Sequence, residues 1–416
     1  MKATLYAGLH PQQRHLAGDP EKSNFFSGLF GRTMGLCLGC FIAFGSGLAR
    51  SDEVELREEQ FMRIHCSLPP AETWRSLQAL RTMDINPADQ EYSYDLWLPR
   101  GYLDDPDKHW PVLFLGNPVE NRGLHTMRDW VVSNGVIVVK LMQAGRGASY
   151  DVAIGNFLAA HDDVMQRCRI QDGLKFATGF SAGARISSVA VQLRPGFAGL
   201  ILQGAGLAQY RSGGRAPYLS DGIRSSRWIG VAMVMGSDDR NMSEVPRVSP
   251  LLGSSQYKVF EFDGGHTWAP PEAFAEAADW LMRYALYEGP VNPALENYYA
   301  EYFWTLVRSA QAEEDPWKRY SLISEAAALA DARGIGRSPD EREILSLMSS
   351  ESRRLRSDPA VSHQLRAASV LGRIEEGGAR MRPQALRQQL QSFLDQYGNT
   401  EAAANARTML TELPEQ

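Results

Sequence analysis

The sequence predicts an α/β protein with a mostly parallel sheet covered by helices on both faces, followed by a C-terminal all-helical domain. Short apolar runs alternate with amphipathic helical patterns from Tyr92 to Tyr284. The runs are nearly continuous in Val, Ile and Leu, which is typical of strands buried on both faces. After residue 288 glycine thins out, and Ala, Arg, Glu and Leu recur with helical spacing.

The order of these patterns gives the expected elements. The predicted strands are Tyr92–Pro99, Pro111–Gly116, Val136–Met142, Leu174–Gly179, Leu200–Gly204, Trp228–Gly236 and Tyr257–Phe262. The predicted helices are His125–Gly135, Asp151–Cys168 with Asp151 as N-cap, one ending at Leu193, Pro271–Leu286, and in the tail Glu296–Gln311, Trp317–Gly334 and Pro383–Gly398. The end of the tail resembles a tetratricopeptide-type unit, but no clean period repeats.

Length and composition fit a globular chain with more than one domain. It has 416 residues, of which 22% are charged and 44% apolar. The formal net charge of −6 argues against nucleic acid as a partner. We divide the chain into an N-terminal export-signal region (1–50), an N-terminal extension (51–90), an α/β domain (91–288) and a helical domain (289–416).

The N-terminal region contains a short apolar stretch within Met34–Ser51, followed by Gly47-Leu48-Ala49. We expect an export signal cut near Ala49, with Met34 as an alternative start, so the protein is expected to be periplasmic or secreted. An uncleaved membrane anchor is the alternative. Removal of the signal would leave two cysteines, Cys66 and Cys168, either paired or as separate buried thiols.

A serine between two glycines lies where a predicted strand meets a predicted helix. The stretch Gly179-Phe180-Ser181-Ala182-Gly183 has the Gly-x-Ser-x-Gly pattern. On a sharp strand-to-helix turn, a larger side chain at either glycine would clash, and the serine is raised above the sheet edge. A serine hydroxyl needs a neighbouring base to act as a nucleophile. We therefore expect Ser181 to be a nucleophile with partners downstream.

An acid and a histidine follow Ser181 in the order that this chemistry uses, each after a predicted strand. Asp238 and Asp239 follow one strand, and His266 follows the next within a glycine-rich loop. The only other histidine after the acids, His363, lies in the helical tail. We expect Ser181 and His266 to form a catalytic pair. Adjacent aspartates point in opposite directions on an extended chain, so only one can orient the histidine.

Two backbone N–H groups are expected to face the negative charge that develops on an attacked ester carbonyl. One belongs to Ala182, directly after the nucleophile. The second is expected after the strand Pro111–Gly116, where Asn117 is better placed than Pro118, which has no N–H. The long loop Gln209–Arg227, which holds four arginines, is expected to be either a flap over the site or a solvated loop.

These motifs resemble the α/β-hydrolase superfamily. The residues that carry the resemblance are Gly179–Gly183, Asp239 and Gly265-His266-Thr267-Trp268. The "GGHTW" sequence is similar to the polyhydroxybutyrate-depolymerase and feruloyl-esterase-like branch, and to related phospholipase/carboxylesterase-like proteins. The resemblance covers Tyr92 to Tyr287. The loop after Gly116 lacks the His-Gly pair common in that family, and the helical tail is foreign to it.

The resemblance implies a serine hydrolase that cleaves carboxylic esters, small or polymeric, through an acyl-enzyme and without a cofactor. In the family the acid tends to fall three residues after the glycine that ends its strand. That glycine is Gly236 here, so the resemblance implies Asp239 as the acid that orients His266. Trp268 is expected either to form an apolar wall of the substrate site or to pack in the interior.

Two other classes of function remain open. A serine peptidase of the prolyl-oligopeptidase type uses the same triad, but it usually carries a large N-terminal propeller, for which residues 51–90 are too few. A non-catalytic envelope scaffold would bind protein partners through the C-terminal helices. No His-x-His, HExxH or paired CxxC pattern offers a metal site. Ester hydrolysis is favoured because an inert domain does not need all three triad groups.

Overall fold

The structure, a computed structural model, describes residues 55–66, 91–116, 124–144, 150–208, 223, 228–252, 256–378 and 381–413. The expected export signal, most of the N-terminal extension and Asn117 lie outside these ranges. The four arginines of the expected flap, Arg211, Arg215, Arg224 and Arg227, also lie outside them. Within the described ranges, no helix combines the length and the apolar character needed to cross a membrane.

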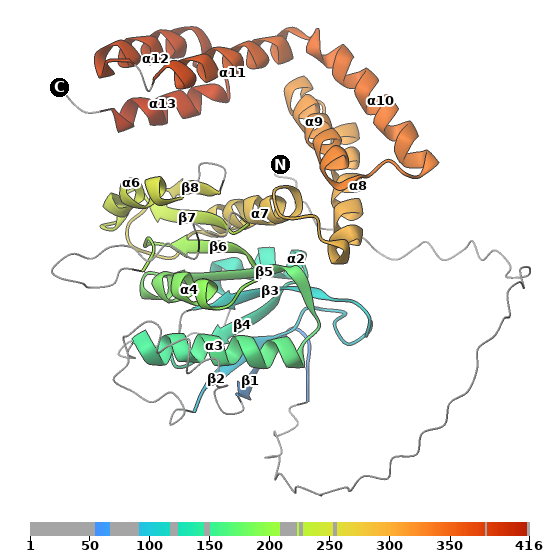
Figure 1. Ribbon diagram of the computed structural model, residues 1–416, viewed down its shortest axis with the longest axis vertical. Helices are drawn as coiled ribbons and strands as arrows, with labels where there is room; N and C mark the ends of the chain where they lie inside the picture. The colour runs from blue at the N-terminus through green and yellow to red at the C-terminus, as the bar shows by residue number, and fades with distance from the viewer. Residues whose placement is uncertain are drawn as a thin grey trace, which may run out of the picture.

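Eight strands form one sheet, in the spatial order β1-β2-β4-β3-β5-β6-β7-β8 (Figure 1). Strand β2 is antiparallel to both its neighbours, whereas every pair from β4 to β8 is parallel. This order, with an antiparallel second strand, is that of the α/β-hydrolase fold and confirms the predicted fold class. The strands are β1 (Phe61–His65), β2 (Ser93–Trp97), β3 (Trp110–Leu115), β4 (Ile137–Leu141), β5 (Ile170–Phe180), β6 (Phe197–Gln203), β7 (Gly230–Gly236) and β8 (Tyr257–Phe262).

Helices cover both faces of the sheet because successive strand residues point to opposite sides. Val112 and Phe114 of β3 belong to the apolar cluster under α3 (Tyr150–Arg167) and α4 (Ala182–Leu193). Leu113 and Leu115 belong to the cluster on the other face, under α2 (Arg128–Ser133) and α7 (Pro271–Tyr287). These strand residues are fully or almost fully buried, as strands between two helical layers require.

Some local predictions differ from the structure. Helix α3 begins at Tyr150, so Asp151 lies inside its first turn, and its prediction as N-cap is wrong. The predicted helix from His125 is divided into a 3-10 turn η2 (His125–Met127) and α2.

Cys66 and Cys168 are two separate thiols, and burial raises the pKa of each to about 12. The other short helices are η3 (Met242–Glu244), α6 (Val245–Val248), η4 (Ser249–Leu251) and η5 (Pro293–Leu295).

The C-terminal region is helical throughout its described residues, as predicted. Asp315 caps α9 by accepting the N–H of Lys318, and Ser338 forms a reciprocal capping box with Glu341 at the start of α10. Each of these helices has proline in its first turn, where the missing N–H costs nothing. The helices are α8 (Glu296–Ala312), α9 (Pro316–Arg333), α10 (Pro339–Arg356), α11 (Pro359–Gly378), α12 (Pro383–Tyr397) and α13 (Ala402–Glu412).

The first tail helices continue the core of the α/β domain. Phe303 of α8 belongs to the same apolar cluster as Phe274 of α7, and Arg333 of α9 donates to the carbonyls of Leu286 and Gly289 at 2.6 and 2.8 Å. In contrast, α11, α12 and α13 form a separate apolar cluster that includes Leu371, Leu390 and Phe393. The independent packing unit of the tail therefore begins near α11 (Figure 1).

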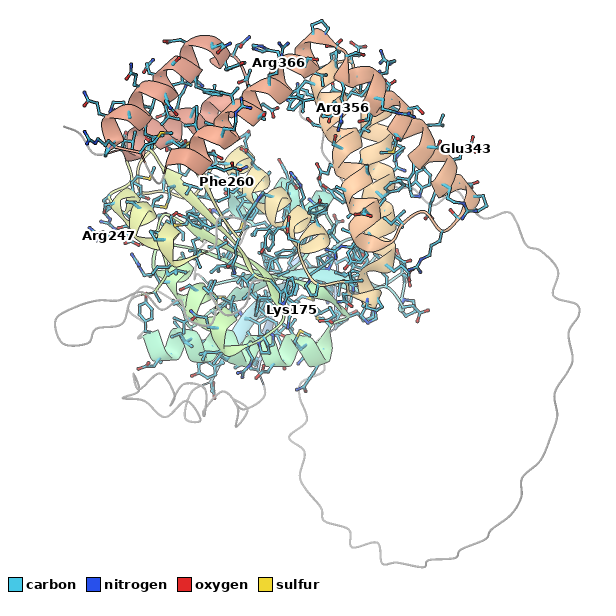
Figure 2. All side chains as sticks on the ribbon, turned by 45° about the horizontal axis from the view of Figure 1, so that its top comes forward. Lys175, Arg247, Phe260, Glu343, Arg356 and Arg366 are labelled. Carbon is cyan, nitrogen blue, oxygen red and sulfur yellow. The ribbon has the colours of Figure 1, made fainter. Side chains whose placement is uncertain are left out.

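A buried charged cluster lies beside the middle of β5 and the amino end of β6. The ring of His161 packs against Phe114 and Phe197, with centroid distances of 5.5 and 5.7 Å. Its Nδ1 is 2.8 Å from Asp162 Oδ1, and its Nε2 is 3.4 Å from Lys175 Nζ. Figure 2 shows Lys175 in the interior of the α/β part.

The charges in this cluster fix the protonation state of His161. Burial lowers the pKa of both His161 and Lys175. Arg194 pairs with Asp162 through two hydrogen bonds of 2.8 and 2.6 Å. A neutral His161 donates from Nδ1 to Asp162 and accepts from the Lys175 ammonium at Nε2, whereas a charged ring would face that ammonium without an acceptor.

This arrangement predicts that protonation of His161 destabilises the fold. In the unfolded chain His161 takes up a proton below its ordinary pKa of 6.5, whereas in the folded chain burial opposes this protonation. The contribution of neutral His161 to the free energy of unfolding is therefore complete above pH 6.5. It is lost as the pH falls below that value, at about 1.4 kcal/mol per pH unit. Denaturant unfolding between pH 7 and 5 should show a shallower pH dependence in His161→Gln than in wild type. The exposed His109→Gln is the control, and equal slopes in all three proteins would contradict this assignment.

The packing of the tail predicts different effects for two truncations. A chain ending at Gly289 exposes apolar surface on α7 and should melt roughly 10 °C lower, because each large apolar side chain contributes about 1.5–3 kcal/mol when buried. A chain ending at Asp358 removes mainly the separate cluster and should melt close to the full-length protein. Differential scanning calorimetry measures both. Equal melting temperatures for the two truncations would show that α8 and α9 do not support the α/β core.

Candidate active site

The turn that carries Ser181 is strained. Strand β5 ends at Phe180, helix α4 begins at Ala182, and Ser181 between them has φ 52° and ψ −113°. A non-glycine residue in such a conformation costs about 1–3 kcal/mol. A Cβ on Gly179 would lie 2.4 Å from the carbonyl carbon of Gly183, so only glycine fits there. The sequence pattern is thus explained by close contact between strand and helix.

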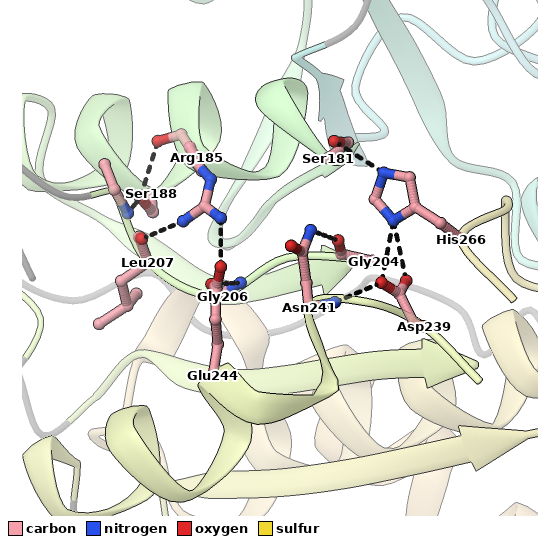
Figure 3. Close-up of polar contacts among 11 residues, drawn as sticks. Ser181, Arg185, Ser188, Gly204, Gly206, Leu207, Asp239, Asn241, Glu244 and His266 are labelled. Atoms are coloured by element: carbon pink, nitrogen blue, oxygen red, sulfur yellow. Dashed lines mark hydrogen bonds and ion pairs between the residues drawn. The ribbon is translucent and has the colours of Figure 1, made fainter. Parts of the chain in front are cut away.

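His266 lies beside this serine. It occupies the loop between β8 and α7, and its Nε2 is 3.0 Å from Ser181 Oγ (Figure 3). The imidazole side chain is 19% exposed, so one part of the ring faces the surroundings and the rest is enclosed. The two residues follow different strands, β5 and β8. They meet because parallel strands end at the same edge of the sheet.

One of the two adjacent aspartates contacts His266. Both carboxylate oxygens of Asp239 are 3.0 Å from His266 Nδ1, and the Asp239 side chain is fully buried. Asp238 is exposed, and its backbone N–H donates to the carbonyl of Gly264 at 2.8 Å. The two side chains therefore lie in different environments, as their adjacent positions require.

The three side chains form one directed chain of hydrogen bonds. The carboxylate of Asp239 can only accept, so His266 carries its proton on Nδ1 and donates to Asp239. His266 Nε2 is then the acceptor for the hydroxyl of Ser181. A hydroxyl whose proton points at a neutral imidazole nitrogen is ready to lose that proton when its oxygen attacks an electrophile.

Of the two expected oxyanion donors, the structure describes Ala182 but not Asn117. Ala182 is the exposed first residue of α4, where backbone N–H groups have no partner within the helix. Gly116 lies tightly against α4, since a Cβ there would be 2.3 Å from Ser187 Oγ. The chain therefore leaves β3 next to the helix that begins after Ser181. Asn117 itself is outside the described residues and remains a prediction.

Aromatic side chains pack on one side of the three groups. Phe180 contacts His266 and Trp268, with ring centroids 4.7 and 5.3 Å apart. Trp268 also stacks on His125, at 5.7 Å and an interplanar angle of 8°. Trp268 is half-buried in this stack, and its role as a wall of the substrate site remains a prediction.

Sequence reasoning misses His125, which has unusual features for a structural residue. Its φ is 49°, its Nε2 is buried without a hydrogen-bond partner, and burial together with Lys140 lowers its pKa. No local signal marks this backbone conformation, because glycine or asparagine would be expected there. Nothing in the described part of the chain explains the unpaired nitrogen.

Hydrogen bonds also tie Asp239 to the neighbouring chain, and the sequence patterns do not reveal these contacts. The backbone N–H of Asn241 donates to Asp239 Oδ1 at 2.8 Å, and its side chain donates to the carbonyl of Gly204 at 2.8 Å (Figure 3). Within the described ranges, no group of three or more His, Cys, Asp or Glu side chains is arranged to hold a metal ion.

Comparison with known proteins gives distant structural likenesses only. No family model and no curated protein matches the sequence. The chain is similar to the S-formylglutathione hydrolase FrmB from Staphylococcus aureus, at 13% identity over 53% of this chain and 98% of that one, with a TM-score of 0.39. The chain is also similar to Est1E from Butyrivibrio proteoclasticus, at 15% sequence identity over 47% of this chain and 95% of that one, with a TM-score of 0.37. It is similar to a putative dipeptidyl aminopeptidase IV from Bacteroides ovatus at 11% sequence identity over 54% of this chain and 36% of that one, with a TM-score of 0.38.

Proposed function

We propose that the protein is a serine hydrolase that cleaves carboxylic esters through Ser181, His266 and Asp239. One observation carries this proposal: the continuous hydrogen-bond chain from a buried carboxylate through an imidazole to a serine hydroxyl, with each contact at 3.0 Å. The strained backbone of Ser181 supports it, because strain of this kind concentrates at functional residues. No cofactor is needed for this chemistry.

In the first half of the reaction, Ser181 Oγ attacks the ester carbonyl carbon while its proton passes to His266 Nε2. The carbonyl oxygen becomes negative in the tetrahedral intermediate, and the N–H of Ala182 is the proposed donor to it, with Asn117 as the second. Asp239 stabilises the imidazolium that forms. When the intermediate collapses, His266 gives its proton to the departing alcohol oxygen, and the acyl group stays on Ser181 as an ester.

In the second half, water replaces the alcohol. His266 takes a proton from the water as the water oxygen attacks the acyl carbon. The second intermediate collapses by returning that proton to Ser181 Oγ, which releases a carboxylic acid and restores the starting state. The same three groups serve both halves because each half transfers one proton to His266 and one proton from it.

The preference for esters over peptides rests on the resemblance of "GGHTW" in residues 264–268 to esterase-like sequences. We also propose that the reaction takes place outside the cytoplasm, as the apolar stretch before Ala49 suggests. A fluorophosphonate probe tests the nucleophile without knowledge of the substrate. A panel of chromogenic esters and peptide amides then decides between an esterase and a peptidase, and absence of both labelling and turnover would favour the scaffold alternative.

Removal of the Ser181 hydroxyl is expected to abolish activity. Ser181→Ala should lose fluorophosphonate labelling and lower kcat for ester hydrolysis on the order of a millionfold, as loss of a triad nucleophile does. Circular dichroism should be unchanged, since alanine is smaller than serine and the strained backbone is held by its neighbours. Ser324→Ala, on α9, is the control for a lost helical hydroxyl, because the Ser324 hydroxyl donates to the Tyr320 carbonyl of its own helix, away from the site. Wild-type turnover by the Ser181→Ala variant would show that Ser181 is not the nucleophile.

The two adjacent aspartates should respond very differently to the same substitution. Asp239→Asn should lower kcat by about 10⁴, because an amide facing Nδ1 favours the wrong imidazole tautomer. Asp238→Asn changes an exposed side chain and should leave kcat within about twofold. Steady-state kinetics on one chromogenic ester measures both. The reverse pattern would show that the exposed aspartate, rather than the buried one, orients the histidine during turnover.

A further inference from the structure

The end of β6 lies between the strand that precedes Ser181 and the strand that precedes Asp239. Strand β6 pairs with β5 on one side and with β7 on the other. It ends at Gln203, whose side chain is completely buried, and the chain continues through Gly204 to Ala208. We call residues 203–208 the β6-end segment. A buried amide is unusual in a core and requires partners, so its contacts indicate what it holds together.

Gln203 contacts both the serine turn and the histidine loop. Its carbonyl accepts the backbone N–H of Ser181 at 2.8 Å. Its side-chain Oε1 accepts the N–H of Ala269 at 3.3 Å, three residues after His266, and its Nε2 donates to Thr178 Oγ1 at 3.0 Å. A single buried residue thus links the chain segments that supply the nucleophile and the base.

Gly204 holds the loop that carries Asp239, through Asn241. The side chain of Asn241 donates to the Gly204 carbonyl, while the backbone N–H of Asn241 donates to Asp239, each at 2.8 Å (Figure 3). A Cβ on Gly204 would lie 2.5 Å from the Phe180 ring and 3.2 Å from Asp239 Oδ2. The acid loop therefore rests directly on the β6-end segment, without room for another side chain.

An ion pair fixes the far end of the segment to the helix that follows the nucleophile. Glu244 accepts the N–H of Gly206 at 2.8 Å and pairs with Arg185 at 2.5 Å. Arg185, four residues after Ser181 on α4, also donates to the carbonyl of Leu207 at 2.9 Å. Both charged side chains are mostly buried, so the pair is screened little by solvent.

We propose that the β6-end segment is the common support that sets the positions of Ser181, His266 and Asp239 relative to one another, with Gln203 and Asn241 as positioning residues. The inference rests on the proposed function. Neither residue reacts with substrate. Each acts by holding the reacting groups in register, where a displacement of about 1 Å can reduce the rate a hundredfold.

The experiment compares the same substitution at two buried glutamines. Gln203→Met removes both side-chain hydrogen bonds and keeps a similar length. Gln256→Met is the control: Gln256 is only 5% exposed, and it donates to the Ile223 carbonyl at 3.1 Å near the opposite end of β7. Asn241→Ala is a second test in a less buried position, in case Gln203→Met does not fold.

Two measurements report position rather than stability. The first is the NMR signal of the proton on His266 Nδ1, which lies in the hydrogen bond to Asp239. This signal should move upfield and broaden in Gln203→Met and Asn241→Ala, because a displaced carboxylate holds the proton less firmly. The second is kcat on a small ester, which should fall about 10- to 100-fold in the same variants, with KM changed less than about threefold.

Gln256→Met should lower the melting temperature without changing either readout. Wild-type kcat and an unchanged His266 Nδ1–H signal in Asn241→Ala, and in Gln203→Met where it folds, would overturn the inference. The Nδ1–H signal does not depend on turnover. If the wild type hydrolyses no ester but the variants change this signal as expected, the positioning role stands and the proposed function fails.

Discussion

The close contact between β5 and α4 at Ser181 is the constraint on which the rest of the site depends. Gly179 and Gly183 approach so closely that no Cβ fits on Gly179, and the backbone between them is forced to a positive φ at Ser181. Strain of this size persists only where the surroundings hold it. Here the serine N–H is bound by the neighbouring strand, and the helix starts at the next residue. Ser181 is therefore held in a fixed position, and His266 reaches it from the loop after β8.

Two polar networks lie at different ends of β6. At its carboxyl end, hydrogen bonds connect Ser181, His266 and Asp239, and the ion pair of Arg185 and Glu244 lies beside them. At its amino end, His161, Lys175 and Asp162 form a second network. Both are enclosed by apolar layers, where unpaired polar groups are costly. Burial of charge alone therefore does not distinguish these two ends. The strained backbone of Ser181 and the exposed start of α4 do distinguish them.

Local signals in the sequence predict much of the fold and of the candidate site. Apolar runs bounded by glycine and proline predict the strands from β2 to β8, and glycine spacing, chain order and family resemblance predict Ser181, His266 and Asp239. Strand β1 is missed because Phe61–His65 is short and only two of its residues are buried. His125, Gln203 and Asn241 are missed because their contacts join residues far apart in the chain. Arg333, which ties α9 to the end of α7, is missed for the same reason.

Contacts between segments that are distant in the chain bring the three side chains of the site together. The hydrogen bond between Ser181 and His266 joins residues 85 positions apart, across three parallel strand pairings that each need a crossover. Such non-local pairings form slowly, since chain entropy is lost before the contacts are gained. A chain still emerging from synthesis contains Ser181 but not the imidazole of His266 beside it. For the proposed hydrolase, the topology therefore delays reactivity until β8 and the loop that carries His266 are in place.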